Sequence, residues 1–168
     1  LKNKLSEINQ FANSTISQLR DTIWAMNKNE ITFEDLQGRI LTFIEKAKSA
    51  TNNSIHFNSI TMVTSKLLFS SVKGISIFRV IQEAINNAIK YADSTHILVS
   101  LTHSENILSI VIDDNGKGFE PNKVKKVKNG DGGMGMTFMR ERIKYIDGRL
   151  FLNSDIGKGT RVTLNIPL

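Results

Sequence analysis

Apolar residues recur at intervals of three and four over the first 26 positions, which is the pattern of an amphipathic helix. A helix of roughly 26 residues has to bury that stripe against another helix, in this chain or in a second copy. The polar run NKNE at 27–30 interrupts the pattern. The stripe consists of Leu5, Ile8, Ala12, Ile16, Leu19, Ile23 and Met26.

A second helix is predicted to begin at Thr32. The run T-F-E-D places an acid at the third helical position, as in a capping box. We expect the helix to run from Phe33 to about Lys48, before NNS at 52–54 breaks it. The segment SIHFNSI then alternates like a strand, and 61–69 is ambiguous, with a short strand as one interpretation. The inward positions of the helix are Phe33, Leu36, Ile40, Phe43, Ile44 and Ala47.

The remainder of the chain alternates helices with hairpins. Gly74 precedes the strongly periodic helix ISIFRVIQEAINNAIKYA, and HILVSLTHSENILSIVIDD predicts a hairpin that turns at HSEN. From Asn115 to Gly133 the chain predicts a long loop, of the kind that is functional or disordered. Helix resumes at MGMTFMRERIKYID with Gly148 as its C-cap, and a second hairpin turns at DIGKG.

This order of elements predicts an α+β fold. We expect an α/β sandwich in which helices cover one face of a mixed sheet, with the first helix standing outside it. Two parts follow: residues 1–31, the helix, and residues 32–168, a single domain.

Composition narrows the possible chemistry. The sequence contains no cysteine, which excludes disulfides and cysteine-based metal or redox sites. No apolar run approaches the roughly 20 residues that span a bilayer, and no signal-peptide pattern is present. The sequence begins with Leu1, so any membrane anchor is expected in segments that precede it.

The net charge is +6, which suits a polyanionic nucleotide as well as a solvated charged loop. The lysines that crowd one stretch are Lys117, Lys123, Lys125, Lys126 and Lys128.

The string NGDGGMGM contains a G-x-G-x-x-G pattern, Gly130, Gly132 and Gly135, which is typical of dinucleotide-binding folds. That fingerprint needs a buried strand running into the glycine turn. Here KVKKVKN precedes it and is too charged for a central strand. The P-loop pattern is absent as well, because GKGT at 157–160 lacks the upstream glycine. A different nucleotide site is therefore the better interpretation.

Asp114 closes a predicted strand in DDNGKGF, followed by Gly116 and Gly118. A carboxylate there can accept a hydrogen bond from an exocyclic amine, and the glycines allow backbone to approach a flat ring. An ordinary Asp-Asn-Gly turn is the alternative.

Upstream, EAINN places Glu83 and Asn87 one helical turn apart, with Lys90 three residues later. These groups suit a hard cation and phosphate oxygens, although an exposed polar helix face is the better explanation of this motif taken alone. Downstream, GKGT ends a flexible turn with the hydroxyl of Thr160, where a structural β-turn is the alternative.

The order of these four motifs resembles the ATP-binding domain of sensor histidine kinases, in the superfamily called GHKL. The resemblance covers roughly residues 32–168 and implies the α/β sandwich of that superfamily. LRDTIWAMN resembles the end of the second dimerisation helix in one subfamily of these kinases, which also has a helix similar to MRERI. That subfamily often has a histidine at the position of Tyr91. The corresponding motifs are the N box (Glu83, Asn87) and three glycine boxes (Asp114, Gly116, Gly118; Gly133, Gly135; Gly157, Gly159, Thr160).

By that resemblance, Asn87 would coordinate a Mg²⁺ that bridges the phosphates of ATP, and Lys90 would reach toward phosphate. Asp114 would bind the adenine amino group, with Thr160 supporting it through water. Asn87 and Lys90 would be catalytic residues, and a catalytic role for Glu83 is a hypothesis. The lysine-rich stretch would be the lid over ATP. Backbone amides at a helix N-terminus would hold phosphate oxygens, at Gly133, Gly135 and Met136.

Histidine kinases phosphorylate a histidine followed by an acid on the first dimerisation helix. His56, His96 and His103 lie in or beside predicted strands, and none precedes an acid. The sequence is therefore expected to bind ATP without phosphorylating itself. The resemblance implies transfer to a histidine in an upstream helix, then to an aspartate of a response regulator.

The resemblance also implies a cytoplasmic homodimer joined through the dimerisation helices, with membrane attachment only through segments absent here. No nucleic-acid partner is expected, because the lysines lie in one loop without interleaved aromatics. An anti-sigma-factor-type serine kinase or another GHKL ATPase is one alternative, against which the first helix argues. A non-catalytic ATP-sensing dimerisation module is another, against which the intact motifs argue.

Overall fold

A computed structural model of the chain describes residues 12, 15–16, 19–24, 29–52, 54–64, 66–121 and 134–168. Residues 19–24 are helical and are called the N-terminal segment below. The elements that follow are β1 (Glu30–Thr32), α2 (Phe33–Ala50), β2 (His56–Met62), β3 (Leu68–Ser70), α3 (Ser71–Tyr91), β4 (His96–Ser104), β5 (Ile107–Asp114), α4 (Met134–Tyr145), β6 (Arg149–Ser154) and β7 (Thr160–Pro167).

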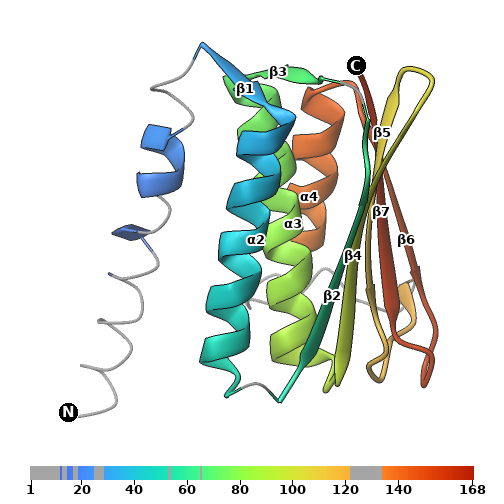
Figure 1. The fold of residues 1–168 in the computed structure, drawn as a ribbon. Helices are drawn as coiled ribbons and strands as arrows, with labels where there is room; N and C mark the ends of the chain where they lie inside the picture. The colour runs from blue at the N-terminus through green and yellow to red at the C-terminus, as the bar shows by residue number, and fades with distance from the viewer. Residues whose placement is uncertain are drawn as a thin grey trace.

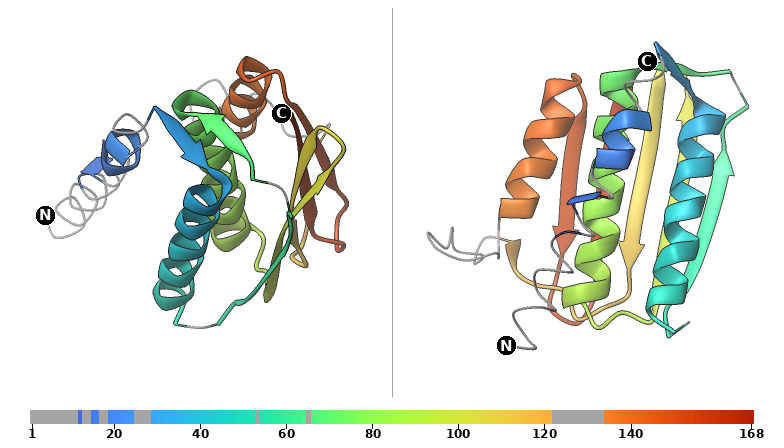
Figure 2. Two further views of the ribbon diagram at one scale, coloured as in Figure 1. Left: turned by 45° about the horizontal axis from the view of Figure 1, so that its top comes forward. Right: turned by 90° about the vertical axis from the view of Figure 1, so that its left-hand side faces the viewer.

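Five of the strands form one mixed sheet in the order β2-β4-β5-β7-β6. β2 pairs with β4 in parallel, and the other three pairings are antiparallel. Helices α2, α3 and α4 stand side by side against one face of this sheet (Figure 1 and Figure 2). The predicted α+β sandwich is therefore confirmed, and the sheet is not the parallel sheet of a dinucleotide-binding fold.

The core lies between the sheet and the helices. Successive side chains of a strand point to opposite faces, and in the central strands every second residue is buried. Asp114 stands at the last buried position of β5, in a row that is otherwise apolar. The buried strand residues are Ile97, Val99 and Leu101 of β4, Leu108, Ile110 and Ile112 of β5, and Val162, Leu164 and Ile166 of β7.

The capping box predicted at the start of α2 is present. Asp35 N donates to Thr32 Oγ1 over 3.1 Å, and Thr32 N donates to Asp35 Oδ2 over 3.3 Å. Both hairpins also turn where predicted, between β4 and β5 and between β6 and β7. These features are local in sequence, which is why the sequence pattern specifies them.

The start of α3 differs from the prediction. The helix begins at Ser71, so Gly74 lies inside it rather than before it. A Cβ at Gly74 would lie 2.6 Å from Ile31 Cδ1, so the glycine makes room for a buried side chain of β1. β1 was not predicted, and it pairs with β3 in a separate two-stranded antiparallel sheet.

The end of α4 also differs in detail. The left-handed residue after the helix is Asp147, with φ of 59°, and not Gly148. Gly148 N donates to Ile143 O over 2.9 Å, as the second residue beyond a helix end does in a Schellman motif. A Cβ at Gly148 would lie 2.8 Å from both Ile143 Cγ2 and Ile166 Cδ1. The glycine is needed for helix–sheet contact rather than for a left-handed turn.

The N-terminal segment lies outside the sandwich, beside α2 and α3 (Figure 1). The described residues at 12, 15–16 and 19–24 are helical, as the amphipathic pattern predicts. The other positions of that pattern lie outside the described residues, and so does most of the lysine-rich stretch. Within the described ranges, every helix is too short or too polar to span a bilayer.

Candidate functional site

Asp114 is a buried carboxyl at the point where β5 ends. Only 8% of its surface is exposed, and its neighbours across the sheet are Ile97 of β4 and Thr160 of β7. Gly116 N donates to Asp114 Oδ1 over 2.8 Å. Burial raises the pKa of Asp114, an effect that the N–H groups of Gly116 and Thr160 partly offset. The fold therefore keeps a polar acceptor in an otherwise apolar row.

Gly116, just after β5, packs closely against the end of α3. A Cβ at this position would lie 2.3 Å from the backbone oxygen of Ala92, which leaves no room for a side chain. The next residue, Lys117, donates its N–H to the same Ala92 oxygen over 2.7 Å. The glycine predicted to allow close backbone approach does so here toward the protein's own helix.

Asn115, for which no role was predicted, bonds the end of β5 to the start of β4. Its Oδ1 accepts hydrogen bonds from Thr95 N over 3.0 Å and from His96 N over 2.9 Å. Asx residues in turns commonly bind nearby backbone, so the DNG turn signal could have indicated this role. The segment therefore has the backbone contacts of an Asx turn, and its binding of a flat ring stays a prediction.

The first and third glycine boxes meet in space. Gly118 has φ of 60°, and a Cβ there would lie 1.9 Å from Asp155 O. Gly159 has φ of 78°, and a Cβ there would lie 1.9 Å from Asp114 O. Gly157 N donates to Lys117 O over 2.6 Å. The β6–β7 turn is thus bound to the segment that follows β5.

The hydroxyl of Thr160 lies beside that junction. Ser154 Oγ lies 3.0 Å from Thr160 Oγ1, and it accepts from Phe119 N and donates to Gly159 O, each over 2.9 Å. No role was predicted for Ser154 from the sequence. Its only signal is its position opposite Thr160 across the predicted hairpin.

The N box and the second glycine box also meet. Asn87 Nδ2 donates to Glu83 Oε1 over 3.3 Å, so both side chains share a face of α3, as predicted. A Cβ at Gly135 would lie 2.2 Å from the same Glu83 oxygen, which places the start of α4 directly against the N box. Met136 is partly buried against the core. Gly133 lies outside the described residues, and so do Gly130 and Gly132.

Two lysines of the predicted site have different surroundings. Lys90 is exposed near the end of α3. Lys117 forms an exposed ion pair with Asp93, with Nζ 2.9 Å from Oδ2. The other lysines of the crowded stretch lie outside the described residues, so the lid remains a prediction.

The three histidines occupy strands, as predicted. His56 lies in β2, and His96 and His103 lie in β4. The rings of His56 and His96 are neighbours across the parallel pair, with centroids 5.1 Å apart. Among the described residues, no group of three His, Cys, Asp or Glu side chains is arranged to hold a metal ion.

The first and third glycine boxes occupy one end of the sandwich. The end of α3, the end of β5 and the β6–β7 turn lie together at the lower end in Figure 1. The site consists of a buried acceptor at the sheet end, glycine-rich backbone around it, and an amide–carboxylate pair where α4 begins. Such a set can bind a ring amine at one point and a polyanion with a cation at another.

Comparison with known proteins agrees with this geometry. Residues 73–168 match the family described as histidine kinase-, DNA gyrase B-, and HSP90-like ATPase. A sensor-like histidine kinase of Chloroflexus aurantiacus is 28% identical over 166 residues, which are 98% of this chain and 28% of that protein. The histidine-protein kinase/phosphatase DegS of Bacillus subtilis is 33% identical over 114 residues, which are 68% of this chain and 29% of that protein. The chain spans less than a third of either relative.

Solved structures share the fold. The catalytic domain of the histidine kinase ThkA matches 82% of this chain and 93% of its own, with a TM-score of 0.64 and 16% identity. The mycobacterial sensor histidine kinase MprB matches 82% of this chain and 95% of its own, with a TM-score of 0.62 and 16% identity. The chain belongs to the family of histidine kinase-, DNA gyrase B- and HSP90-like ATPases, and its α+β fold is that of histidine kinase catalytic domains.

Proposed function

We propose that the chain is the ATP-binding catalytic part of a sensor histidine kinase. It transfers the γ-phosphoryl group of Mg-ATP to a histidine of an upstream dimerisation helix, from which the group passes to an aspartate of a response regulator. The observation that carries the proposal is the pairing of the motifs in space: the first and third glycine boxes meet beside the buried Asp114, and Glu83 of the N box lies against Gly135 of the second box. The names of the relatives and the family match support it.

Asp114 is the residue proposed to select adenine. Its carboxylate would accept the hydrogen bond of the exocyclic amine, beside the backbone that Gly116 and Gly118 bring to the end of β5. Thr160, supported by Ser154, assists through water. Guanine carries an oxygen where adenine carries this amine, so ATP should bind more tightly than GTP.

Asn87 is proposed to hold Mg²⁺ together with phosphate oxygens. Its amide nitrogen is engaged by Glu83, so its amide oxygen would be the ligand atom, and oxygen ligands are what Mg²⁺ prefers. The ion would supply positive charge to neutralise the phosphates. Lys90 adds a positive charge near the end of α3, and the amides of Gly133, Gly135 and Met136 receive phosphate oxygens.

Glu83 is proposed to act beside the phosphates because it touches both Asn87 and the start of α4. Its role is either to orient Asn87 or to accept a proton from the attacking group. A Glu83→Ala protein whose nucleotide affinity and phosphorylation rate both match the parent would remove Glu83 from the site.

The remaining parts of the proposal concern the longer protein. It is a homodimer through its dimerisation helices, with residues 1–31 as the end of the second helix and residues 32–168 as the catalytic domain. It works in the cytoplasm, and any membrane anchor lies in other segments.

Calorimetric titration of the chain with a non-hydrolysable ATP analogue tests the proposal. We expect saturable binding that is stronger with Mg²⁺ than without it, and stronger for the ATP analogue than for the GTP analogue. Asn87→Ala should remove the Mg²⁺ dependence, whereas Glu45→Gln, which removes an exposed ion pair of α2, should bind like the parent. Absence of binding by the parent chain contradicts the proposal.

Phosphoryl transfer is tested with radiolabelled ATP. The full-length protein should acquire acid-labile phosphate, while the present chain should acquire none, because its three histidines lie in strands. Acid-labile phosphate on the present chain would show that its own histidines accept the group.

A further inference from the structure

A groove runs along the outer edge of β6, beside α4. β6 is the last strand of the five-stranded sheet, and within the described part of the chain β7 is its only strand neighbour. Helix α4 packs next to it, at one side of the sandwich (Figure 2). The groove has a volume of about 570 Å³ and is lined by residues 148–153 together with Arg140 and Lys144 of α4. Successive residues of a strand point to opposite faces, so a hollow that contacts all of 149–153 follows the strand edge, where the backbone N–H and C=O groups are.

The groove is basic and has no acidic lining residue. Arg140, Lys144 and Arg149 line it, and all three are exposed. None of them forms an ion pair with any residue that the structure describes. Arg140 and Lys144 are also four positions apart on one helix, a spacing at which like charges repel and lower helix stability. The fold therefore carries an uncompensated cluster of positive charge at this groove.

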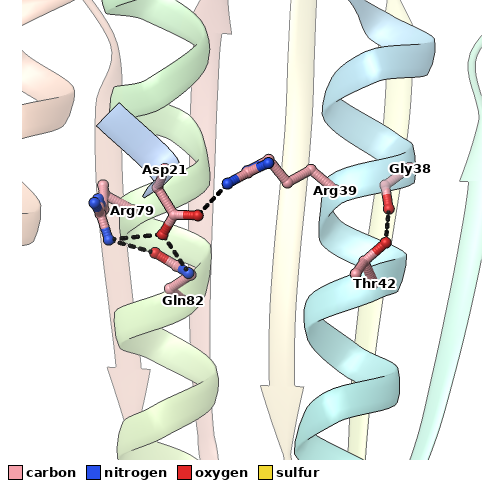
Figure 3. A network of polar contacts seen from close by, with 6 residues as sticks. All are labelled: Asp21, Gly38, Arg39, Thr42, Arg79 and Gln82. Atoms are coloured by element: carbon pink, nitrogen blue, oxygen red, sulfur yellow. Dashed lines mark hydrogen bonds and ion pairs between the residues drawn. The ribbon is translucent and has the colours of Figure 1, made fainter. Parts of the chain in front are cut away.

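Several cations elsewhere in the structure have acidic partners. Arg39 of α2 and Arg79 of α3 pair with the same buried carboxylate, that of Asp21 (Figure 3). On the open face of the sheet, Arg161 pairs with Asp113 over 2.5 Å. The groove has the cations of such pairs without the acid, so an acidic group from outside would complete it.

The shape of the groove suits an extended segment. Leu150 and Leu152 are half-buried and point to the helix side of the sheet, as their partners in β7 do. Arg149 and Phe151 lie on the opposite face. A segment that pairs with the free edge of β6 would place alternate side chains on these two faces. One set would lie over the leucines, beside the cations of α4, and the other would lie beside Arg149 and the ring of Phe151.

We propose that the α4–β6 groove binds an acidic, extended segment of a partner protein, which adds to the edge of β6 as a further strand. Main-chain hydrogen bonds to the edge would give affinity, and carboxylates at alternate positions would give specificity. The groove contains none of the residues of the proposed nucleotide site, so this inference stands apart from the proposed function.

The occupant does not come from this sequence. The net charge is +6, so a second copy is repelled from a basic groove. Nowhere in the sequence do two acidic residues stand at positions i and i+2, the spacing that would direct two carboxylates to one face of an added strand. A segment with alternating acids therefore has to be supplied by a partner.

Fluorescence anisotropy with a labelled synthetic peptide that alternates glutamate with threonine tests the groove. We expect saturable binding that weakens as salt is raised, and no comparable binding of a peptide that alternates lysine with threonine. The same glutamate peptide with N-methylated backbone amides cannot donate to a strand edge, and it should bind about tenfold more weakly. Failure of the glutamate peptide to bind, or equal binding of its N-methylated form, would overturn the proposal.

The variant Arg140→Gln with Lys144→Gln removes the helix side of the charge cluster. It should bind the glutamate peptide about tenfold more weakly than the parent, and its unfolding midpoint should not fall, because the like-charge pair is gone. The matched control, Lys46→Gln with Lys66→Gln, lowers the net charge equally at exposed positions and should bind like the parent. An equal loss in the control would show that net charge alone attracts the peptide, which would contradict a specific groove.

Vesicles containing phosphatidylserine and inorganic tripolyphosphate represent the other anions that a basic groove attracts. If either probe binds more tightly than the glutamate peptide, and loses that binding in the Arg140→Gln with Lys144→Gln variant, the groove is a lipid or phosphate site and the proposal is wrong. Hydrogen exchange of the β6 amides supplies a second reading. It should slow when the glutamate peptide binds, because the strand edge is then paired, and it should not slow with the other two probes.

Discussion

A Cβ at Gly135 would stand 2.2 Å from Glu83 Oε1, so the first turn of α4 rests directly on the acid of α3. The two residues are more than fifty positions apart in the sequence, and the lysine-rich stretch lies between them. Glu83 in turn accepts a hydrogen bond from Asn87, so a displacement of the start of α4 would change the surroundings of both side chains. This contact links the segment that precedes α4 to the proposed metal ligand.

Gly135→Ala should alter the site more than the fold. The atom in the way is the end of a flexible side chain, so Glu83 can swing aside, and alanine favours a helix by about 1 kcal/mol over glycine. We expect an unfolding midpoint equal to or above that of the parent, with ATP-analogue affinity reduced roughly tenfold in the presence of Mg²⁺. Calorimetric titration and thermal melts of the same preparation measure both. Unchanged affinity would indicate that Glu83 moves without consequence for Asn87.

Gly116→Ala, in contrast, should lower the free energy of unfolding. Its Cβ would meet the backbone oxygen of Ala92 at 2.3 Å, and backbone cannot swing aside as a carboxylate can. Overpacking of this kind costs about 1–3 kcal/mol, which lowers the unfolding midpoint by several degrees in a chain of this size. Gly38→Ala is the matched control, because nothing lies within 4 Å of its Cβ and α2 should gain stability. Equal midpoints for both variants would contradict the packing of β5 against α3.

Asp114→Asn should weaken binding of the ATP analogue and increase the free energy of unfolding at neutral pH. Burial raises the pKa of Asp114 above its ordinary value of 3.8, so the folded chain holds this proton more firmly than the unfolded chain. The resulting contribution to the free energy of unfolding is complete below the ordinary pKa and is lost as the pH rises through the raised pKa. Asparagine keeps an acceptor for Gly116 N without the buried charge.

The variant should consequently melt above the parent at neutral pH, and the difference should shrink toward pH 3. Its affinity for the ATP analogue should fall by about 10- to 100-fold, the equivalent of one hydrogen bond to a charged group. Asp113→Asn is the control: that carboxylate pairs with Arg161 over 2.5 Å on the open face of the sheet. A parent that is more stable than Asp114→Asn at neutral pH would refute the assigned direction of the shift.

Ser154→Ala should loosen the junction between the β6–β7 turn and the segment after β5. It removes the acceptor of Phe119 N and the donor to Gly159 O, at a cost of about 1–3 kcal/mol for a donor left without a partner. Denaturant unfolding measures the loss. Ser109→Ala, which removes a single bond to Asn165 on the open face, should cost less. A smaller loss for Ser154→Ala than for Ser109→Ala would contradict this account.

The sequence predicted the elements whose evidence is local. The capping box at Thr32, the alternation in β4 and β5, and the two hairpins follow from spacing within a few residues. The N box was also predictable, because Glu83 and Asn87 are one turn apart in one helix. Their roles and the lid remain predictions.

The errors and omissions depend on contacts between distant parts of the chain. Gly74 signals a helix boundary in sequence, yet it lies inside α3 because Ile31 needs its space. The three-residue strands β1 and β3 are too short to show periodicity. Ser154 carries no signal until β6 is paired with β7, and Asp21 shows no partner until α2 and α3 are packed. The parallel pairing of β2 with β4 likewise needs the fold.

The position of β7 has a consequence for how the site is made. β7 is the final strand in chain order, yet it lies between β5 and β6 in the sheet, and Thr160 is paired with Asp114. During synthesis, β5 therefore emerges with its partner still missing, and Asp114 has no flanking strand on that side. The proposed nucleotide site therefore lacks Thr160 and the glycine turn until β7 pairs with β5.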